Sequence, residues 1–384
     1  MKLGLALLNS LRIRRAYRDL PTVCRARPAR ADIEPTTYCN FRCPHCPTVA
    51  RPKQSDGAAA SGASPRAHLS LSDFTRILDQ LPTVYRVKLV GLGEPLLNPD
   101  FFDMVRAARR RGVRVLTTTN GSLLDAERRR ELLSCGLHHL NISVDAANPE
   151  THARLRPGSD LEQIADGVKA LVRERGPRRF PVIRVWHVVQ RESTAEIPAL
   201  VQRCLDWGVD GLLCTAKLTN FGSAPMEEVV GRRRAVADDL QRVLPEARRL
   251  AESAHLEFRC PSAPPPPGKP SHGRPCRWPW SRTFITAQGH VVPCPYASGP
   301  EGLLLGRLLP GRAAPEVDFG SAWNGLAMQR LREAIRSNAN PAFCRACYPG
   351  WSGAGVTCAA AVSAVEGESG AAASPPGAAP RSSA

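Results

Sequence analysis

The sequence predicts an α/β protein built around a parallel sheet. Short apolar runs alternate with helical segments, and 43% of the 384 residues are hydrophobic, which is enough for a sizeable core. The strand-like runs lie at residues 33–37, 87–91, 113–119, 140–145, 182–189 and 211–216. Six strand–helix units in succession imply a parallel sheet that is curled, with its helices outside.

Boundary residues mark the helices between these strands. Polar residues that cap a helix N-terminus precede several of the helical segments, and glycines that end a helix follow them. These residues are Ser70 with Asp73 for the first helix, Asn98 and Gly112 for the second, Gly136 for the third, and Thr194 and Gly208 for the fifth.

Changes in composition divide the chain into segments. A basic, Leu-rich arm is expected to form an amphipathic helix on the outside of the main domain, and a tail rich in Ala, Ser, Gly and Pro is expected to be disordered. The expected segments are the arm at 1–30, the core at 31–220 with a flexible insert at 50–68, a helix and Pro-rich linker at 221–270, a small cysteine-bearing unit at 271–358 and the tail at 359–384.

The formal net charge of +17 raises the question of an acidic partner. The excess is scattered, with much of it in arginine runs such as 109–111 and 232–234, and such runs are usually solvated. Nucleic acid is therefore not the expected partner. No apolar run approaches the roughly 18 residues of a membrane span, and the first residues lack a cleavage site, so the sequence predicts a cytoplasmic protein with reduced thiols.

Three cysteines carry the strongest chemical signal. Cys39, Cys43 and Cys46 are four and then three residues apart, so one short loop can bring three thiolates to one metal centre. Four cysteines normally hold a cubane iron–sulfur cluster, so three leave one iron open to a small molecule. The alternatives are a zinc site, which usually has paired ligands at each end of its motif, and three unrelated buried thiols.

With the preceding segment Glu34-Pro35-Thr36-Thr37, this loop resembles the cluster loop of the radical S-adenosylmethionine (SAM) enzymes. The resemblance implies a partial (β/α)6 TIM-like barrel and a [4Fe–4S] cluster whose open iron binds SAM. Reductive cleavage of SAM then yields a radical that abstracts a substrate hydrogen. It also implies a reductant such as flavodoxin or ferredoxin.

Further motifs fall at the ends of later strands, where barrel enzymes place their sites. Gly91-Leu92-Gly93-Glu94-Pro95 resembles the family element in which glycine lets the backbone approach the ligand and the carboxylate accepts a hydrogen bond from SAM. The resemblance implies SAM contacts for Gly93, Glu94, Asn120, Ser143, Asp145, Arg156 and Arg184. Capping or surface solvation is the alternative role for each.

A second cysteine set lies in the last third of the chain. An expected β-hairpin separates Cys276 from Cys294, an expected helix spans 322–337, and Cys344 and Cys347 follow. The set resembles the SPASM and twitch domains, which implies a second, auxiliary [4Fe–4S] cluster. Only Cys358 follows the set, which favours the shorter twitch form. A four-cysteine zinc site is the alternative.

Cys214 is the remaining cysteine with an expected role. Its place in the sixth strand, near the catalytic rim, suggests the thiol that returns a hydrogen atom in related epimerases. The other cysteines are expected to be buried thiols that act as small apolar groups.

The sequence thus predicts a radical SAM oxidoreductase that oxidises its substrate through the auxiliary cluster, for example at a secondary alcohol of a sugar or cyclitol. The enzyme alternatives are a peptide maturase and a redox-neutral epimerase. The non-enzyme alternatives are an iron–sulfur electron carrier and an RNA-binding protein. A small molecule or a peptide remains open as the substrate, because no set of residues fixes its identity.

Overall fold

The computed structural model describes residues 2–47, 67–215, 218, 224–233, 237–261, 275–298, 302–310, 316–341 and 343–344. Its described strands form one sheet with the order β10-β9-β8-β1-β2-β3-β4-β5-β6-β7. The strands are β1 Arg30–Ile33, β2 Arg86–Leu89, β3 Arg114–Thr119, β4 His139–Ser143, β5 Val182–Val188, β6 Gly211–Thr215, β7 Glu257–Arg259, β8 Arg282–Ile285, β9 His290–Val292 and β10 Gly306–Arg307.

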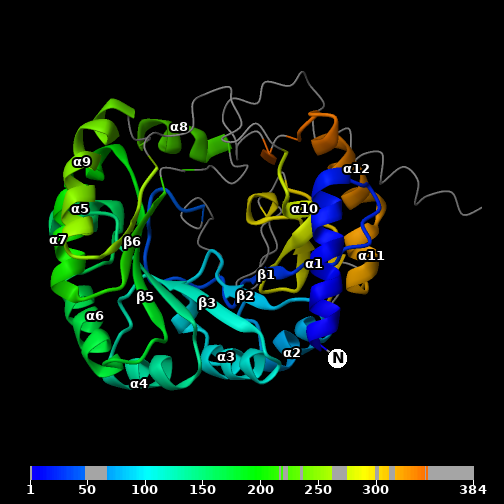
Figure 1. The fold of residues 1–384 in the computed structure, drawn as a ribbon, viewed down its shortest axis with the longest axis horizontal. Helices are drawn as coiled ribbons and strands as arrows, with labels where there is room; N and C mark the ends of the chain where they lie inside the picture. Colours follow the sequence, from blue (N-terminus) through cyan, green and yellow to red (C-terminus); the bar gives the residue numbers. More distant parts are fainter. Residues whose placement is uncertain are drawn as a thin grey trace, which may run out of the picture.

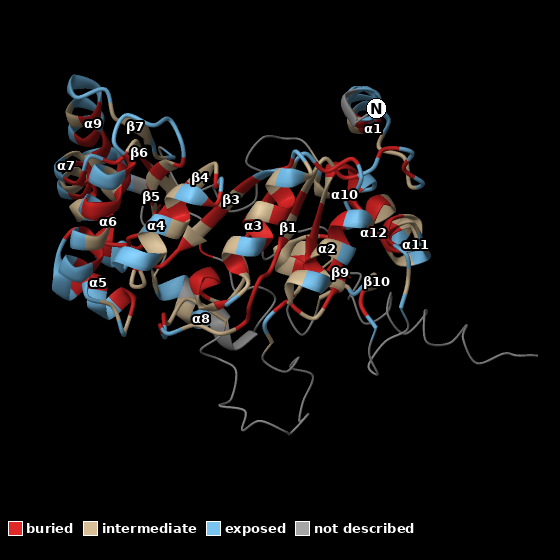
Figure 2. Ribbon diagram, turned by 90° about the horizontal axis from the view of Figure 1, so that it is seen from below, coloured by how far each residue is buried: buried red, intermediate tan, exposed pale blue. Residues whose placement is uncertain are grey.

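Helices follow most of the strands and pack on the outer face of the curved sheet (Figure 1). The helices are α1 Lys2–Asp19, α2 Leu71–Asp79, η1 Pro95–Leu97, α3 Phe101–Arg110, α4 Ala126–Ser134, α5 Pro149–Leu155, α6 Leu161–Arg175, η2 Arg191–Glu196, α7 Ile197–Trp207, α8 Ala224–Arg233, α9 Ala237–Ser253, α10 Trp278–Ser281, η3 Pro295–Ala297, α11 Phe319–Asn324 and α12 Leu326–Arg336. Figure 2 shows buried residues along the strands and on the helix faces turned toward them.

The predicted fold class is confirmed. Strands β1 to β7 are parallel, and β1 and β7 lie six places apart in an open sheet, as a partial barrel requires. Several expected helix boundaries are also found: Ser70 caps α2 and accepts from the Asp73 amide, and Gly208 ends α7 in the left-handed conformation. The first strand is displaced from its predicted range of 33–37: it spans Arg30–Ile33 and overlaps that range only at Ile33.

The segment predicted as a helix and linker at 221–270 contributes to the sheet. Helix α9 packs against α7, and β7 adds a seventh parallel strand beside β6. The sequence prediction missed β7 because a three-residue strand is too short to show a periodic pattern.

The C-terminal hairpin continues the barrel sheet. Strands β8 and β9 are antiparallel, as predicted, and β8 also pairs in parallel with β1, which places Arg282 opposite Arg30 and Ile285 opposite Ile33. The helix predicted over 322–337 is two helices, α11 and α12, separated at Gly325. The hairpin is therefore fixed to the barrel by backbone hydrogen bonds and does not depend on a linker for its position.

One buried carboxylate strengthens this connection. Glu34, at the end of β1, accepts hydrogen bonds from the amide of Leu92 at 2.8 Å and from the amide of Ala287 at 3.2 Å. Leu92 lies in the loop after β2, and Ala287 lies in the hairpin turn between β8 and β9. Glu34 thus joins the barrel rim to the C-terminal unit.

Helix α1 packs on the outside, as expected for the N-terminal arm. Its Asn9 exchanges two 2.9 Å hydrogen bonds with the backbone of Arg27, and Tyr17 donates to the Ser281 hydroxyl at 2.5 Å. Among the residues that the structure describes, no helix combines the length and apolar character needed to cross a membrane.

We predict that Glu34→Gln lowers the free energy of unfolding by about 1–3 kcal/mol, because an amide group would direct its own N–H donors at backbone donors. Urea unfolding followed by circular dichroism measures the change. Glu127→Gln is the matched control, because Glu127 is exposed on α4. Equal unfolding midpoints for the two variants would contradict the bridging role of Glu34.

Candidate functional site

The loop that carries Cys39, Cys43 and Cys46 follows β1 and is held by three neighbouring segments. The Glu94 amide donates to the carbonyl of Tyr38 at 2.8 Å, and the Arg42 amide donates to the carbonyl of Pro157 at 3.0 Å. The Asn120 side chain donates to the Asn40 side chain at 2.8 Å. The ends of β2, β3 and α5 therefore fix the conformation of the cysteine loop.

Gly93 allows the backbone after β2 to lie close to the backbone segment that leads into the cysteine loop. A Cβ atom at this position would lie 2.3 Å from the carbonyl oxygen of Thr36 and 2.5 Å from that of Tyr38. Both neighbours are backbone atoms of the segment that leads into the cysteine loop, so neither can move without moving the loop. Glycine is needed here for this backbone approach.

Glu94 is buried and accepts three hydrogen bonds from its own chain. The donors are the Thr119 hydroxyl at 2.6 Å and the amides of Asn120 at 2.7 Å and Leu96 at 3.1 Å. Burial raises the pKa of Glu94, and these hydrogen bonds oppose the increase. The carboxylate thus joins the ends of β2 and β3, and its remaining acceptor capacity is the part that a SAM ammonium would use.

Asp145 and Arg156 form a buried ion pair beside the cysteine loop. Arg156 Nε lies 2.8 Å from Asp145 Oδ2, and the Val188 amide donates to Asp145 Oδ1 at 2.9 Å. His45 Nε2 lies 3.7 Å from Asp145 Oδ2. Burial would raise the pKa of Asp145, but Arg156, His45 and His187 outweigh it and hold the pKa at about 2. In this arrangement the two predicted SAM ligands neutralise each other.

Ser143 and Asn120 also lie at this rim. Ser143 is the last residue of β4 and is the register partner of Trp186. Asn120 follows β3, and its side-chain oxygen Oδ1 accepts hydrogen bonds from the backbone amide and the hydroxyl of Ser122. The structure thus brings Gly93, Glu94, Asn120, Ser143, Asp145 and Arg156 to the end of the barrel that carries the cysteine loop.

Arg184 is placed elsewhere, and its predicted role is not supported. It lies four residues before the end of β5, which is about 13 Å at 3.3 Å per residue. Its guanidinium forms a 2.6 Å ion pair with Glu257 and lies 2.7 Å from His139 Nδ1. A partner on β7, the strand that the sequence analysis missed, accounts for this difference.

The loop cysteines fit an iron–sulfur cluster. Burial, with smaller contributions from Cys46, Asp145 and Cys39, raises the pKa of Cys43 to about 12 against the opposing charge of Arg156, so the three thiols influence one another. The Phe41 amide also donates to Cys39 Sγ at 3.4 Å. Within the described residues, no three side chains converge as the ligands of a single ion would. A cubane spreads its cysteine ligands over different irons and does not require such convergence.

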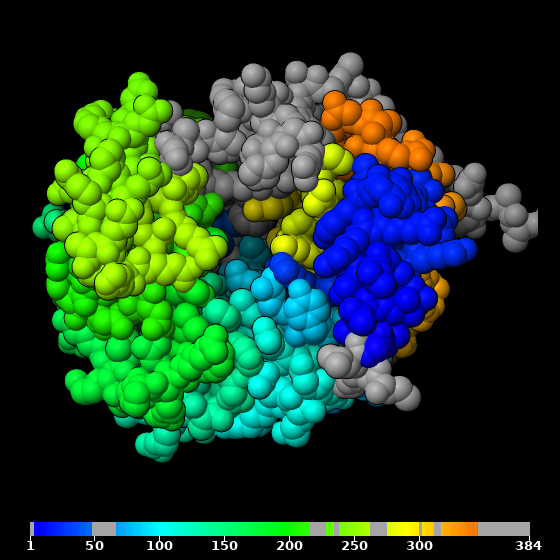
Figure 3. Space-filling view, viewed as in Figure 1, coloured from blue at the N-terminus to red at the C-terminus, as the bar shows by residue number. Residues whose placement is uncertain are grey.

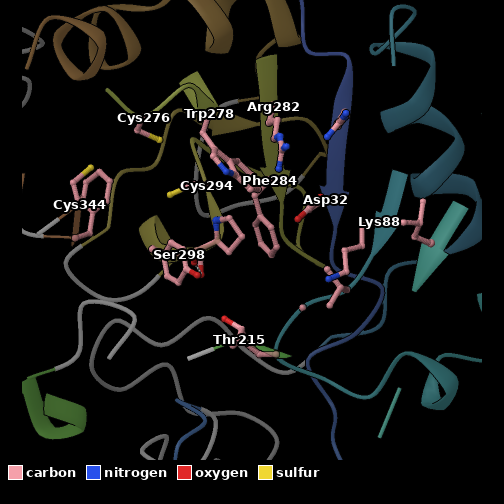
Figure 4. Close-up of a pocket in the computed structure, with 18 of the residues that line it drawn as sticks. Asp32, Lys88, Thr215, Cys276, Trp278, Arg282, Phe284, Cys294, Ser298 and Cys344 are labelled. Carbon is pink, nitrogen blue, oxygen red and sulfur yellow. Dashed lines mark hydrogen bonds between the residues drawn. The ribbon is translucent and has the colours of Figure 1, made fainter. Parts of the chain in front are cut away.

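A cavity of about 620 Å³ lies between the barrel and the C-terminal unit. Figure 3 shows the molecule hollowed between the green barrel segments and the yellow hairpin. His45 of the first cysteine loop lines the cavity, as do Cys276, Cys294 and Cys344 of the second set. Figure 4 shows these three cysteines on one side of the cavity and Thr215 on another. A substrate in the cavity would therefore lie between the two cysteine sets.

The fourth predicted member of the second set, Cys347, lies outside the described residues, as does Cys358. Cys276, Cys294 and Cys344 come from different segments, namely the start of α10, the end of β9 and the chain after α12. Their common exposure to one cavity fits a shared metal centre and gives the hairpin a role in positioning it.

Cys214 lies in β6 near the rim, as predicted, but its side chain does not face the cavity. It pairs in register with His187, while the next pair, Val188 and Thr215, lines the cavity. Neighbouring residues of a strand point to opposite faces, so the Cys214 thiol points toward the helices. A side-chain hydrogen bond with Cys260, together with burial, raises the pKa of Cys214 well above its ordinary value.

The sequence analysis also missed charged residues inside the barrel. Asp32 of β1 and Lys88 of β2 are register partners, and both line the cavity. Lys88 Nζ lies 5.5 Å from the centre of the Trp186 ring. The signal was present as an alternation of charged and apolar residues in Arg30-Ala-Asp32-Ile and Arg86-Val-Lys88-Leu, which predicts one polar face for each strand.

Comparison with known protein families identifies both parts of the molecule. A model described as the radical SAM superfamily matches residues 33–204, and a model of the SPASM iron–sulfur cluster-binding domain matches residues 276–348. This chain belongs to the radical SAM superfamily. Its family implies a SAM-binding [4Fe–4S] cluster at the first cysteine loop and an auxiliary iron–sulfur cluster in the SPASM domain.

Two curated relatives of this radical SAM protein differ in the fraction of the chain that aligns with it. The tungsten-containing aldehyde ferredoxin oxidoreductase cofactor-modifying protein of Pyrococcus furiosus is 31% identical over 47% of this chain and 49% of its own length. The PqqA peptide cyclase of Gluconobacter oxydans is 26% identical over 76% of this chain and 75% of its own length. The chain spans about half the length of the first relative.

A solved structure shares the fold. Streptococcus suis SuiB bound to its precursor peptide SuiA superimposes with a TM-score of 0.58 at 17% identity, covering 84% of this chain and 70% of SuiB. At this identity, the comparison establishes the arrangement of strands and helices.

We predict that Gly93→Ala disturbs the cysteine loop, because the added Cβ would overlap two backbone carbonyls. After anaerobic reconstitution, SAM affinity should fall at least about tenfold, or roughly 1.4 kcal/mol. Equilibrium dialysis with labelled SAM measures the affinity. Gly231→Ala is the control, because a Cβ there meets no atom within 4 Å. Unchanged SAM affinity in Gly93→Ala would exclude the proposed close approach.

Proposed function

We propose that this radical SAM protein carries out a net two-electron oxidation of a peptide. The observation that carries the proposal is the cavity lined by His45 of the first cysteine loop and by Cys276, Cys294 and Cys344 of the second set, since a substrate held there lies beside both segments. When bound, the two clusters supply a SAM-derived radical that removes a hydrogen atom and an acceptor for the second electron.

The choice of a peptide is supported by the extent of the sequence match. Of the two curated relatives described above, the PqqA peptide cyclase aligns over three quarters of both chains, whereas the cofactor-modifying protein aligns over about half. The expected oxidation of a sugar or cyclitol has no such support among these relatives. A peptide substrate accordingly replaces it as the first choice.

The position of Cys214 bears on the choice between oxidation and epimerisation. An epimerase that uses a thiol as hydrogen donor needs that thiol in the substrate cavity, whereas Cys214 points toward the helices. In contrast, Cys276, Cys294 and Cys344 line the cavity. The described cysteines thus favour electron transfer to an auxiliary cluster. A flavodoxin or ferredoxin would supply the electron for SAM cleavage.

The proposed function predicts that loss of the second cysteine set lowers the iron content and stops product formation without stopping SAM cleavage. The anaerobically reconstituted protein should hold about eight irons, as two four-iron clusters. Combined Cys276→Ala, Cys294→Ala and Cys344→Ala should leave about four irons and SAM cleavage intact. With a candidate precursor peptide as substrate, the unaltered protein should yield a product lighter by two hydrogen atoms, and the triple variant should yield none.

Iron analysis and mass spectrometry of the peptide measure these outcomes. Cys135→Ala is the matched control, because Cys135 is buried at the end of α4 and does not line the cavity. Zinc in place of iron at the second set would exclude the electron-acceptor role. A product of unchanged mass that carries solvent deuterium would indicate epimerisation instead.

A further inference from the structure

The cavity has a basic floor, which we define as Arg30, Arg86, Arg282 and Lys88. The three arginines are the first residues of β1, β2 and β8, and Arg30 is the register partner of both Arg86 and Arg282. Neighbouring strands lie about 4.8 Å apart, and register partners in a parallel pair share a face. All four floor residues line the cavity, so their positive charges are concentrated at one end of it.

The basic floor has little negative charge to balance it. Asp32 is the one carboxylate among the described lining residues, facing four cationic side chains. Arg30 donates to the Tyr85 hydroxyl at 3.2 Å, and Arg282 lies over the Trp278 ring at 5.1 Å. Within the described part of the chain, none of the floor residues forms an ion pair.

The two buried arginines in the described part of the barrel, Arg156 and Arg175, do form ion pairs, unlike the half-buried floor residues. Arg156 pairs with Asp145, and Arg175 pairs with Asp210, so each has a carboxylate partner in contact. Burial lowers the pKa of Arg86, and the neighbouring Arg30 lowers it further. Like charges this close repel one another in a partly desolvated cavity. An anion bound at the floor would relieve this repulsion.

The apolar lining beside the floor favours a carboxylate on an aliphatic stem as that anion. A guanidinium binds a carboxylate or a phosphate through two parallel hydrogen bonds. The four cations outweigh Asp32 and attract either anion, so the rest of the lining decides between the two. The walls beside the floor include Trp186, Trp278 and Phe284, which suit the apolar stem of an acidic side chain.

We propose that the basic floor binds a carboxylate of the substrate, so that the modified peptide is acidic at or beside the reacting residue. This inference rests on the peptide function proposed above. It assigns Arg86 as the principal binding residue, because Arg86 lies between the register positions of Arg30 and Arg114, and no side-chain hydrogen bond or ring contact of Arg86 is described.

The test is a binding measurement with the reconstituted enzyme and SAM. The probes are two fluorescently labelled hexapeptide amides that are identical except for a central Glu or Gln, and binding is followed by fluorescence anisotropy. The Glu peptide should bind about tenfold more tightly than the Gln peptide. Arg86→Gln should remove this preference and leave the affinity for the Gln peptide unchanged.

Arg114→Gln is the matched control. Arg114 is the first residue of β3 and the register partner of Arg86, but its side chain is exposed and does not line the cavity. The control should keep the Glu preference. Equal binding of the two peptides, or equal effects of Arg86→Gln and Arg114→Gln, would overturn the proposal.

Two competitors separate this inference from the proposed function. In one outcome neither peptide binds, while glutarate binds to the unaltered enzyme and not to Arg86→Gln. The basic floor is then an anion site, and the proposed peptide function fails. If inorganic phosphate displaces the Glu peptide at lower concentration than glutarate does, the carboxylate assignment fails. The proposal is supported if glutarate displaces the Glu peptide from the unaltered enzyme but not from Arg86→Gln.

Discussion

The pairing of β1 on both of its edges is the constraint on which the site depends. β2 pairs with one edge and β8 with the other, both in parallel and over the full length of β1. The cysteine loop leaves the end of β1, and β8 carries the C-terminal unit. The Glu34 carboxylate adds hydrogen bonds to the loops on both sides. The positions of the two cysteine sets are thereby fixed by a single short strand.

The same pairing explains the charges inside the cavity. Because β1, β2 and β8 are in register, Arg30, Arg86 and Arg282 form one layer, and Asp32, Lys88 and Phe284 form the next layer toward the rim. The end of the barrel near the cysteine loop is different, since its ionic groups, Asp145 and Arg156, neutralise each other. The barrel therefore has a neutralised ion pair beside the cluster loop, and a cavity whose described lining has four cationic side chains and one carboxylate.

Local patterns in the sequence predicted much of this molecule, and long-range contacts account for what they missed. Apolar runs located β2 to β6 closely and β1 only at its last residue, and cysteine spacing indicated the cluster loop, because both signals lie within a few residues. The roles of Glu34 and Arg184 depend on partners 253 and 73 residues away. The face occupied by Cys214 depends on its register with β5, and a shift of one residue would reverse it.

Anomalous diffraction at the iron absorption edge, from crystals of the anaerobically reconstituted enzyme, tests the central claim most directly. The account predicts iron at two places that both border the cavity, one at Cys39, Cys43 and Cys46 and the other at Cys276, Cys294 and Cys344. It also predicts Asp32 and Lys88 in the cavity wall between them. Iron at the second set on the far side of β8, away from the cavity, would contradict the account.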